Sequence, residues 1–240
     1  METTASGGSV GRVITLMVAT GNRHKVDEIR AGLGAAVMVL STRDVGLALS
    51  PEETGATFAE NAAIKSIAWA RALAVQAPPS GIGWVLADDS GLEVDALGGA
   101  PGVLSARFAA LDDGRPGNSP DGENNAKLLR LLEGVPADRR TARFRCVLAL
   151  TPVLPVTVEA LHQATRWFDG RCEGRIQATA AGCGGFGYDP LFVPEGFSQS
   201  FAELGEEVKN RISHRARALE VLKADSAWQS LVRSSAGTGG

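Results

Sequence analysis

The chain has 240 residues, of which 44% are hydrophobic, and its 24 lysine and arginine residues against 27 aspartate and glutamate residues give a net charge of -3. This length and apolar content are enough for one sizeable globular core. Because a slightly acidic chain has no general positive field, we expect no polymeric nucleic acid as a partner, and any binding of phosphate must depend on locally placed cations.

Cysteine usage and hydropathy indicate the compartment. The sequence has three cysteines, an odd number without a C-x-x-C pair, which disfavours a disulfide framework and a structural zinc site. The apolar run at 13–19 is too short to span a membrane, and the residues before it lack the basic character of a signal peptide. We therefore expect a cytoplasmic protein that does not bind membranes.

The domain organisation is simple. Residues 1–11 and 233–240 are rich in small polar residues that cannot bury enough surface to become ordered, so we expect disordered tails there. Residues 12–232 contain no repeat and no linker, which predicts a single domain. Its first predicted element is a β-branched, apolar strand over 12–19.

The next elements alternate helix and strand. A helix follows the first strand, with Val26, Ile29 and Leu33 on one apolar face. A capping box, T-F-A-E, then opens an alanine-rich helix over 57–75. A buried strand is predicted over 82–87. This alternation is typical of an α/β fold.

The second half contains further strands and ends in a helix. In order, the patterns predict a mobile loop over 111–123, a helix over 124–132, strands over 142–150, 156–160 and 163–168, and an amphipathic helix over about 213–232.

The segment T-G-N-R-H-K, which follows the first strand, predicts an anion site. Asn22 is suited to cap the helix, the free amides of the first helical turn attract an anion, and Lys25 adds a positive charge. Phosphate fits such a site, although no Walker P-loop motif is present. The alternative is that Asn22 is only a cap and Lys25 a solvated side chain.

The segment A-D-D-S-G predicts a metal site in a loop after the strand at 82–87. Asp88 and Asp89, together with Glu52 and Glu53 from an earlier loop, are the hard oxygen ligands that Mg²⁺ prefers. A carboxylate beside such a metal can take a proton from water as a general base. The alternative is an Asx-turn with exposed glutamates.

The segment G-C-G-G-F-G-Y-D-P predicts a loop that closely approaches a ligand. Its glycines let the backbone come near, and Phe186 and Tyr188 offer aromatic faces on which a base can stack. The alternative is a tight turn with Phe186 in the core.

The segment K-N-R-I-S-H-R gathers four basic groups within seven residues. Arg215 and His214, in the first turn of the final helix, can donate hydrogen bonds to a ring carbonyl and so select a 6-oxopurine over adenine. The alternative is an ordinary solvated basic face. Lys65 is a further candidate for phosphate contact, or else a surface lysine.

Taken together and in this order, the motifs resemble those of the Ham1-type inosine/xanthosine triphosphate pyrophosphatase family. The resemblance runs through T-G-N-R-H-K, E-E-T-G-A-T-F-A-E-N-A, A-D-D-S-G-L-E-V-D-A-L-G-G-A-P-G-V-L-S-A-R-F, A-R-F-R-C-V-L-A-L, G-F-G-Y-D-P-L-F and K-N-R-I-S-H-R-A-R-A-L, over nearly all of residues 12–232. It implies an α/β fold with a long mixed sheet, flanking helices and two lobes around a central nucleotide cleft. It also implies a homodimer and the Mg²⁺-dependent hydrolysis of ITP, dITP or XTP to the monophosphate and pyrophosphate.

The resemblance assigns a role to each motif. Asp89 is the implied general base and metal ligand, with Glu52 or Glu53 as the second metal ligand, and Ser90 touches the substrate. The implied phosphate-binding residues are Thr20, Gly21, Asn22, Arg23, His24 and Lys25. The residues implied to frame the base are Phe186, Gly187, Tyr188 and Asp189. The nucleotide site is completed by Lys209, His214 and Arg215, of which the last two lie near the 6-oxo group.

Two other functions agree with parts of this pattern. A Maf-like pyrophosphatase has a similar architecture and acts on other nucleotides, but the S-H-R segment favours a purine. A nucleotide sensor binds without hydrolysis, but it does not need a complete acidic set beside its phosphate site.

Overall fold

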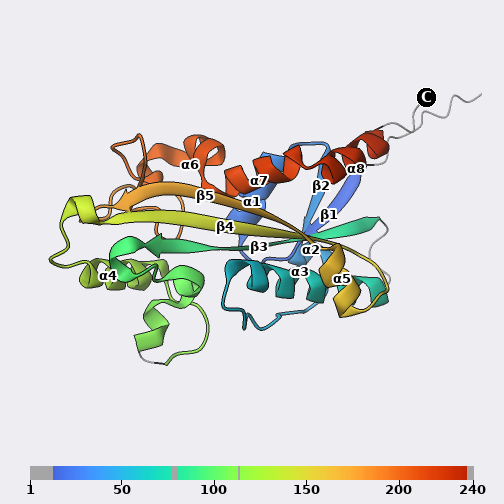
Figure 1. Cartoon of the computed structure of the whole chain (residues 1–240), viewed down its shortest axis with the longest axis horizontal. Coiled ribbons are helices and arrows are strands. Elements are labelled where there is room, and N and C mark those ends of the chain that lie inside the picture. Colours follow the sequence, from blue (N-terminus) through green and yellow to red (C-terminus); the bar gives the residue numbers. More distant parts are fainter. Residues whose placement is uncertain (1–12, 77–80, 113, 237–240) are drawn as a thin grey trace, which may run out of the picture.

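The computed structural model describes residues 13–76, 81–112 and 114–236, so the predicted tail at 1–11 lies outside the described residues. A six-stranded mixed sheet in the order β2-β1-β3-β4-β5-β6 forms the centre of the molecule (Figure 1). β1 pairs in parallel with β2 and β3, and the other pairs are antiparallel. The strands are β1 (Ile14–Val18), β2 (Val37–Ser41), β3 (Ile82–Val94), β4 (Thr141–Pro152), β5 (Arg166–Ile176) and β6 (Phe192–Pro194).

Helices cover both faces of this sheet. In Figure 1, α1 and α7 lie on one side of the long strands and α3 lies on the other; α7 packs on α1, β4 and β5, and α3 packs on β3 and β4. The α-helices are α1 (Arg23–Leu33), α2 (Thr42–Val45), α3 (Phe58–Val75), α4 (Asp121–Leu131), α5 (Val158–Ala164), α6 (Phe201–Ile212), α7 (His214–Ala224) and α8 (Ser226–Ala236). Short 3-10 turns are η1 (Asp95–Leu97), η2 (Gly102–Arg107), η3 (Ala109–Asp112) and η4 (Ala137–Arg139).

The three long strands, β3, β4 and β5, connect two core regions. At one end, Leu16, Ile29 and Leu219 belong to a buried cluster between the sheet and the helices α1 and α7. At the other end, Leu92 and Phe201 belong to a separate cluster that includes residues of α4 and α6. The fold is thus the long mixed α/β sheet that we expected, with a hydrophobic core at each end.

The predicted strand at 156–160 is wrong, because this segment begins helix α5. The Oγ1 atom of Thr157 accepts a hydrogen bond from the amide of Ala160 at 3.2 Å and so caps the helix. Leu161 is then completely buried. A local cap and one buried anchor therefore outweigh the β-propensity of the V-T-V run.

The predicted helix at 213–232 is divided in two, and the predicted tail begins too early. Asp225 ends α7 and starts α8, because its Oδ1 atom accepts a hydrogen bond from the amide of Trp228 at 3.0 Å. Trp228 is 4% exposed and anchors α8 in the core. Helix α8 continues to Ala236, so Arg233 and Ser234 are helical.

The predicted strand at 82–87 is too short. β3 continues to Val94 because β4 pairs with it along its whole second half, up to the pair Val94 and Ala142. Asp88 and Asp89 therefore lie within a strand instead of a loop. Similarly, the segment predicted as a loop at 111–123 overlaps η3 and the first turn of α4.

The sequence patterns did not reveal β2 or α6. Helix α6 begins with a capping box between Ser200 and Glu203, a local signal that would have predicted it. Across the described ranges, no helix has the length and apolar character needed to cross a membrane.

Candidate active site

Two adjacent cavities open where β1 ends. β1 pairs with β3 only as far as Val18 and Leu86, so the following residues of β3 border open space at the carboxyl end of a parallel strand, where α/β sheets commonly bind ligands. The larger cavity has a volume of about 780 Å³ and the smaller one about 170 Å³. Both are lined by Asn22, Lys25, Ser90, Ala106 and Asn118.

The first turn of α1 is the candidate anion site at the larger cavity. Asn22 caps the helix by accepting a hydrogen bond from the amide of Lys25 at 3.3 Å, and Thr20 accepts one from the amide of Asn22 at 3.2 Å. These two caps fix the turn, and Gly21 completes it at the cavity wall. Lys25 lines the same cavity as this helix N-terminus, and its ammonium pairs with Asp88 at the cavity wall.

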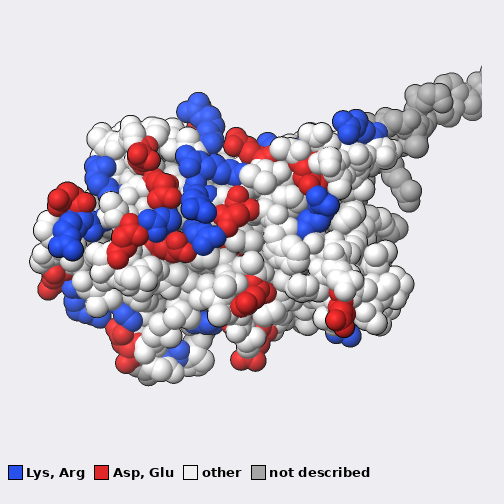
Figure 2. Space-filling view, viewed as in Figure 1, with Lys and Arg blue, Asp and Glu red and all other residues white. Residues whose placement is uncertain are grey.

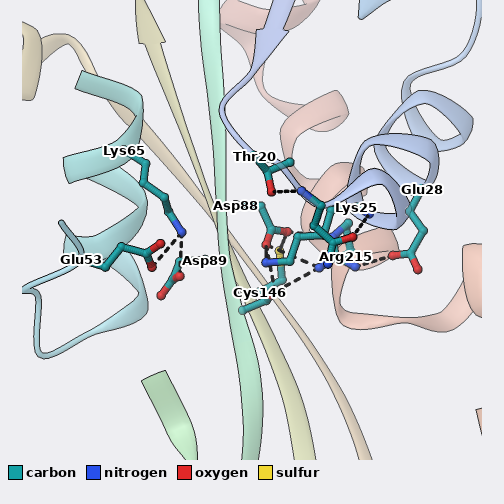
Figure 3. Close-up of polar contacts among 11 residues, drawn as sticks. Thr20, Lys25, Glu28, Glu53, Lys65, Asp88, Asp89, Cys146 and Arg215 are labelled. Atoms are coloured by element: carbon teal, nitrogen blue, oxygen red, sulfur yellow. Dashed lines mark hydrogen bonds and ion pairs between the residues drawn. The ribbon is translucent and has the colours of Figure 1, made fainter. Parts of the chain in front are cut away.

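Asp88 is the centre of a buried hydrogen-bond network (Figure 3). Its Oδ1 atom accepts hydrogen bonds from Lys25 Nζ at 2.5 Å and Ser90 Oγ at 2.9 Å. Its Oδ2 atom accepts from Arg215 Nε at 2.7 Å and Cys146 Sγ at 3.1 Å. Burial alone would raise the pKa of Asp88, but Arg215 and Lys25 outweigh it and hold the pKa well below its usual value.

Glu28 continues this network toward the smaller cavity. Its carboxylate pairs with Arg215 and, at 2.9 Å, with Lys209 Nζ. Burial opposes the charge of Glu28, yet the two cations lower its pKa. Glu28 was not predicted from the sequence, although its spacing from Lys25 puts both side chains on one side of α1.

Asp89 lies on the opposite face of β3 from Asp88 (Figure 3). Lys65 Nζ donates to Asp89 Oδ1 at 2.8 Å and to Glu53 Oε2 at 3.1 Å. The Oδ2 atom of Asp89 is buried and has no hydrogen-bond partner among the described residues. Burial raises the pKa of Asp89 to about 6 because it exceeds the opposing effect of Lys65. Lys65, whose side chain is 12% exposed, is therefore a largely buried partner of the carboxylates, not a surface lysine.

The two candidate glutamates differ in position. Both line the larger cavity, but only Glu53 contacts Lys65, the lysine that also binds Asp89. Burial alone would raise the pKa of Glu53, but the charge of Lys65 lowers it overall, so the side chain stays ionised. Glu52 is exposed.

The donor set at Asp89 fits a hard divalent cation. Within the described ranges, no cluster of three or more His, Cys, Asp or Glu side chains forms a complete metal cage. Asp89 nevertheless has an unpaired, buried oxygen beside a second carboxylate, and Mg²⁺ is commonly held by one or two carboxylates with phosphate and water as its other ligands.

The glycine-rich loop before β6 forms the aromatic wall of the smaller cavity. Gly185 has a φ of 74°, and a Cβ there would collide with the carboxylate of Asp189. Asp189 Oδ2 accepts hydrogen bonds from the amide of Phe186 at 2.9 Å and from Lys209 Nζ at 2.6 Å. Phe186 is half-buried, lines the cavity and has Lys209 Nζ at 4.2 Å from its ring centroid. Gly187 lies on the same wall.

Tyr188 lines the smaller cavity but belongs to the core and does not offer a free stacking surface. Its ring is 3% exposed, and its hydroxyl donates to the carbonyl oxygen of Ser105 at 2.9 Å. Burial raises its pKa, so the phenol is neutral. Of the two aromatic residues in this loop, Phe186 is the candidate for stacking with a ligand.

His214 and Arg215 reach the smaller cavity from the first turn of α7. His214 stacks on Phe144 with ring centroids 4.8 Å apart, and its buried Nδ1 atom has no partner in the described part of the chain. Burial, reinforced by the charges of Arg215 and Lys209, lowers the pKa of His214 well below its usual value, so the imidazole is neutral. Arg215 is 1% exposed and also donates to Ser90 Oγ at 3.0 Å.

Two residues of the T-G-N-R-H-K motif lie away from the expected anion site. The side chain of Arg23 is 84% exposed and pairs with Asp27 at 3.7 Å. The ring of His24 stacks on Phe186, with ring centroids 5.3 Å apart and an interplanar angle of 15°. Neither residue lines the larger cavity. Arg107, which the sequence analysis did not single out, does line it and adds a cation.

The fold and these two cavities define a class: an α/β protein whose cleft presents an anion site and carboxylates at one end and an aromatic wall with buried cations at the other. Such a cleft suits a small ligand that carries both phosphate and an aromatic base. More specifically, the chain belongs to the Ham1 family, whose model matches residues 16–225.

Named relatives and solved structures agree with this membership. A dITP/XTP pyrophosphatase of Desulforamulus reducens is 48% identical over 206 residues, covering 85% of this chain and 92% of that protein. A dITP/XTP pyrophosphatase of Geobacillus kaustophilus is 45% identical over 218 residues, covering 90% of this chain and 95% of that protein. The Ham1 protein of Staphylococcus aureus superposes with a TM-score of 0.70 at 35% identity, covering 88% of this chain and 96% of that one.

Proposed function

We propose that this protein hydrolyses the non-canonical purine nucleoside triphosphates ITP, dITP and XTP to the monophosphate and pyrophosphate, and so removes them from the nucleotide pool. Its family membership and the names of its relatives support the substrate class. The observation that carries the proposal is Asp89, a buried carboxylate with a pKa of about 6 and an unpaired oxygen, at the wall of a cavity that continues into an aromatic pocket.

Asp89 is the proposed general base. A carboxylate with a pKa of about 6 is ionised at neutral pH, and it is more basic than an ordinary aspartate. It takes a proton from water, the oxygen of that water attacks the α-phosphorus, and pyrophosphate leaves. The N-terminus of α1, Lys25 and Arg107 offset the charge of the phosphates, and such electrostatic positioning is the main contribution of a protein to phosphoryl transfer.

Asp89 and Glu53 are the proposed ligands of Mg²⁺. When bound, Mg²⁺ neutralises phosphate charge and orients the phosphates and water. Lys65 holds both carboxylates at the cavity in the absence of the ion, since it contacts each of them. Glu52 remains an exposed neighbour in this proposal.

The smaller cavity is the proposed site of base recognition. Phe186 provides the stacking face, and Lys209, His214 and Arg215 provide hydrogen-bond donors around it. Donors directed at a 6-oxo group have no acceptor in adenine, and a buried mispaired group can lower kcat/KM by about 10⁴-fold. This arrangement supports a preference for ITP and XTP over ATP.

We further propose a homodimer in a reducing, cytoplasmic compartment. The family resemblance supports the dimer, and the three free cysteines agree with a reducing compartment. Light scattering after size-exclusion chromatography measures the oligomeric state. A monomer at micromolar concentration would contradict the proposed dimer.

The decisive test is pyrophosphate release from ITP, XTP and ATP in parallel, each with Mg²⁺ and with excess chelator. We expect metal-dependent release from ITP and XTP and very little from ATP. Equal release from ITP, XTP and ATP would leave a hydrolase without the proposed base recognition, and preferred release from UTP, assayed beside them, would indicate a Maf-like specificity. Tight binding of ITP without release would indicate a sensor.

A further inference from the structure

His24 lies against the aromatic wall of the smaller cavity, although its motif predicts a contact with phosphate. Its imidazole is nearly parallel to the ring of Phe186, with 5.3 Å between the ring centroids and 15° between the planes. It comes from the first turn of α1, whereas Phe186 belongs to a loop far away in the sequence. The stack therefore joins the helix that carries Lys25 to the wall of the proposed base pocket.

The cavity linings distinguish the two sides of Phe186. Phe186 lines the smaller cavity together with Lys209 and Arg215, and so do Asn22 and Lys25 from the same turn as His24. His24 itself lines neither of the two cavities. A side chain lying between Phe186 and the cavity would itself border that cavity. His24 therefore covers the part of the Phe186 ring that faces away from the cavity.

The main chain and the ring of Phe186 are held by different contacts. The backbone of the loop that carries Phe186 is held by hydrogen bonds at Gly187, whose amide donates to Asp121 at 2.6 Å and whose carbonyl accepts from Asn125 at 3.0 Å. These bonds fix the main chain but not the ring of Phe186. Two other side chains contact the ring itself: Lys209 Nζ lies 4.2 Å from the ring centroid, and His24 stacks on the ring.

We propose that His24 is a positioning residue for base recognition: it backs Phe186 as the outer layer of a stack in which the substrate base is the inner layer. An exposed imidazole suits this place because its ring packs while its nitrogen atoms remain in water. The inference rests on the proposed function, because it assumes that a purine binds in the smaller cavity. It assigns His24 to the base instead of to the phosphates.

The test compares KM and kcat for ITP in the full-length protein and its variants. Losing one aromatic pair should raise the KM of His24→Ala about two- to tenfold, with kcat within about twofold of the unaltered protein. His24→Phe, which keeps a ring but removes both nitrogen atoms, should restore the KM. Asp27→Ala changes an exposed residue of the same helix that lines neither cavity and is the matched control.

Inorganic triphosphate separates the two possible roles of His24 because it carries phosphates but no base. Its inhibition constant against ITP hydrolysis should be the same for His24→Ala and the unaltered protein. If His24→Ala weakened the binding of inorganic triphosphate as much as that of ITP, the proposal would be overturned and His24 would belong to the phosphate site. A lower KM for ITP would also overturn it, because His24 would then compete with the base for Phe186.

Two further outcomes complete the test. An unchanged KM in His24→Ala, or a KM in His24→Phe as high as in His24→Ala, would contradict a role in stacking. Thermal unfolding of each variant identifies a general loss of stability, and Asp27→Ala shows how much stability an exposed substitution in this helix costs. If the unaltered protein neither binds nor hydrolyses ITP, the proposed function fails, and this result is distinct from a failure of the His24 inference.

Discussion

Two regions on either side of β3 each contain an aspartate, and the pKa values of these two aspartates are shifted in opposite directions. Around Asp88, two cations, a hydroxyl and a thiol satisfy the carboxylate, and its pKa is well below its usual value. Around Asp89, one lysine is shared with Glu53, one oxygen is unpaired, and the pKa rises to about 6. Successive side chains of a strand point to opposite faces, so neighbours in sequence enter different environments.

This difference is why we propose Asp89, and not Asp88, as the reactive carboxylate. Asp88 has no capacity left for a metal or a proton, and its network connects Lys25 at the larger cavity to Arg215 at the smaller one. Asp89 has both capacities. A substitution that removes only the charge should therefore have different consequences at these two adjacent positions.

The largest expected effect is on turnover. Asp89→Asn removes the proposed base but keeps the shape of the side chain, so kcat for ITP should fall about 10²- to 10⁴-fold while KM changes little. Steady-state pyrophosphate release measures both constants. If kcat stayed within threefold, Asp89 would not be the base.

The second expected effect is on stability. Asp88→Asn leaves Lys25 and Arg215 buried beside a neutral amide, which should lower the free energy of unfolding by about 3–5 kcal/mol. Urea denaturation at pH 8 measures this change.

Asp89→Asn is the matched control for that measurement. The folded-state pKa of Asp89 is raised to about 6, so the cost of its charge to folding grows as the pH rises above the ordinary carboxyl pKa and is complete above about 6; removing the charge at pH 8 should therefore leave stability unchanged or higher. Equal destabilisation by both variants would remove the distinction between the two regions.

A smaller effect should distinguish the two glutamates. Glu53→Gln removes a proposed metal ligand, so the Mg²⁺ concentration for half-maximal activity should rise about 10- to 100-fold. Glu52→Gln should change it less than threefold because Glu52 is exposed and contacts neither Lys65 nor Asp89 among the described contacts. A Mg²⁺ titration at saturating ITP measures both, and the reverse ranking would assign the metal to Glu52.

The smallest effect should appear in the pH dependence of kcat/KM for ITP. The base must be ionised to act, and its pKa in the free protein is about 6, so kcat/KM should decrease as the pH falls through about 6. Below that value the decrease should approach about tenfold per pH unit. The residual activity of Asp89→Asn should lack this decrease; the same inflection in that variant would assign it to another group.

Much of the site followed from local patterns. The helix cap at Asn22, the capping box at Thr57 and the strand periodicity at 142–150 depend on residues near one another in the chain, and the structure confirms all three. The order of the motifs was enough to identify the family, which the family model confirms. The sequence thus supplied the chemical types of the candidate groups: an anion-binding turn, an aromatic loop and a basic segment.

How these groups meet depends on packing between distant segments. Asp88 and Arg215 are 127 positions apart, and their contact depends on α7 packing against the sheet. The extension of β3 by pairing with β4 separated the two aspartates onto opposite faces. Packing likewise brought Glu53 to Lys65, Glu28 to Lys209 and His24 to Phe186. Sequence patterns specify local conformation and the available chemistry, but burial and pairing between distant segments determine which group is charged, which is satisfied and which is free to react.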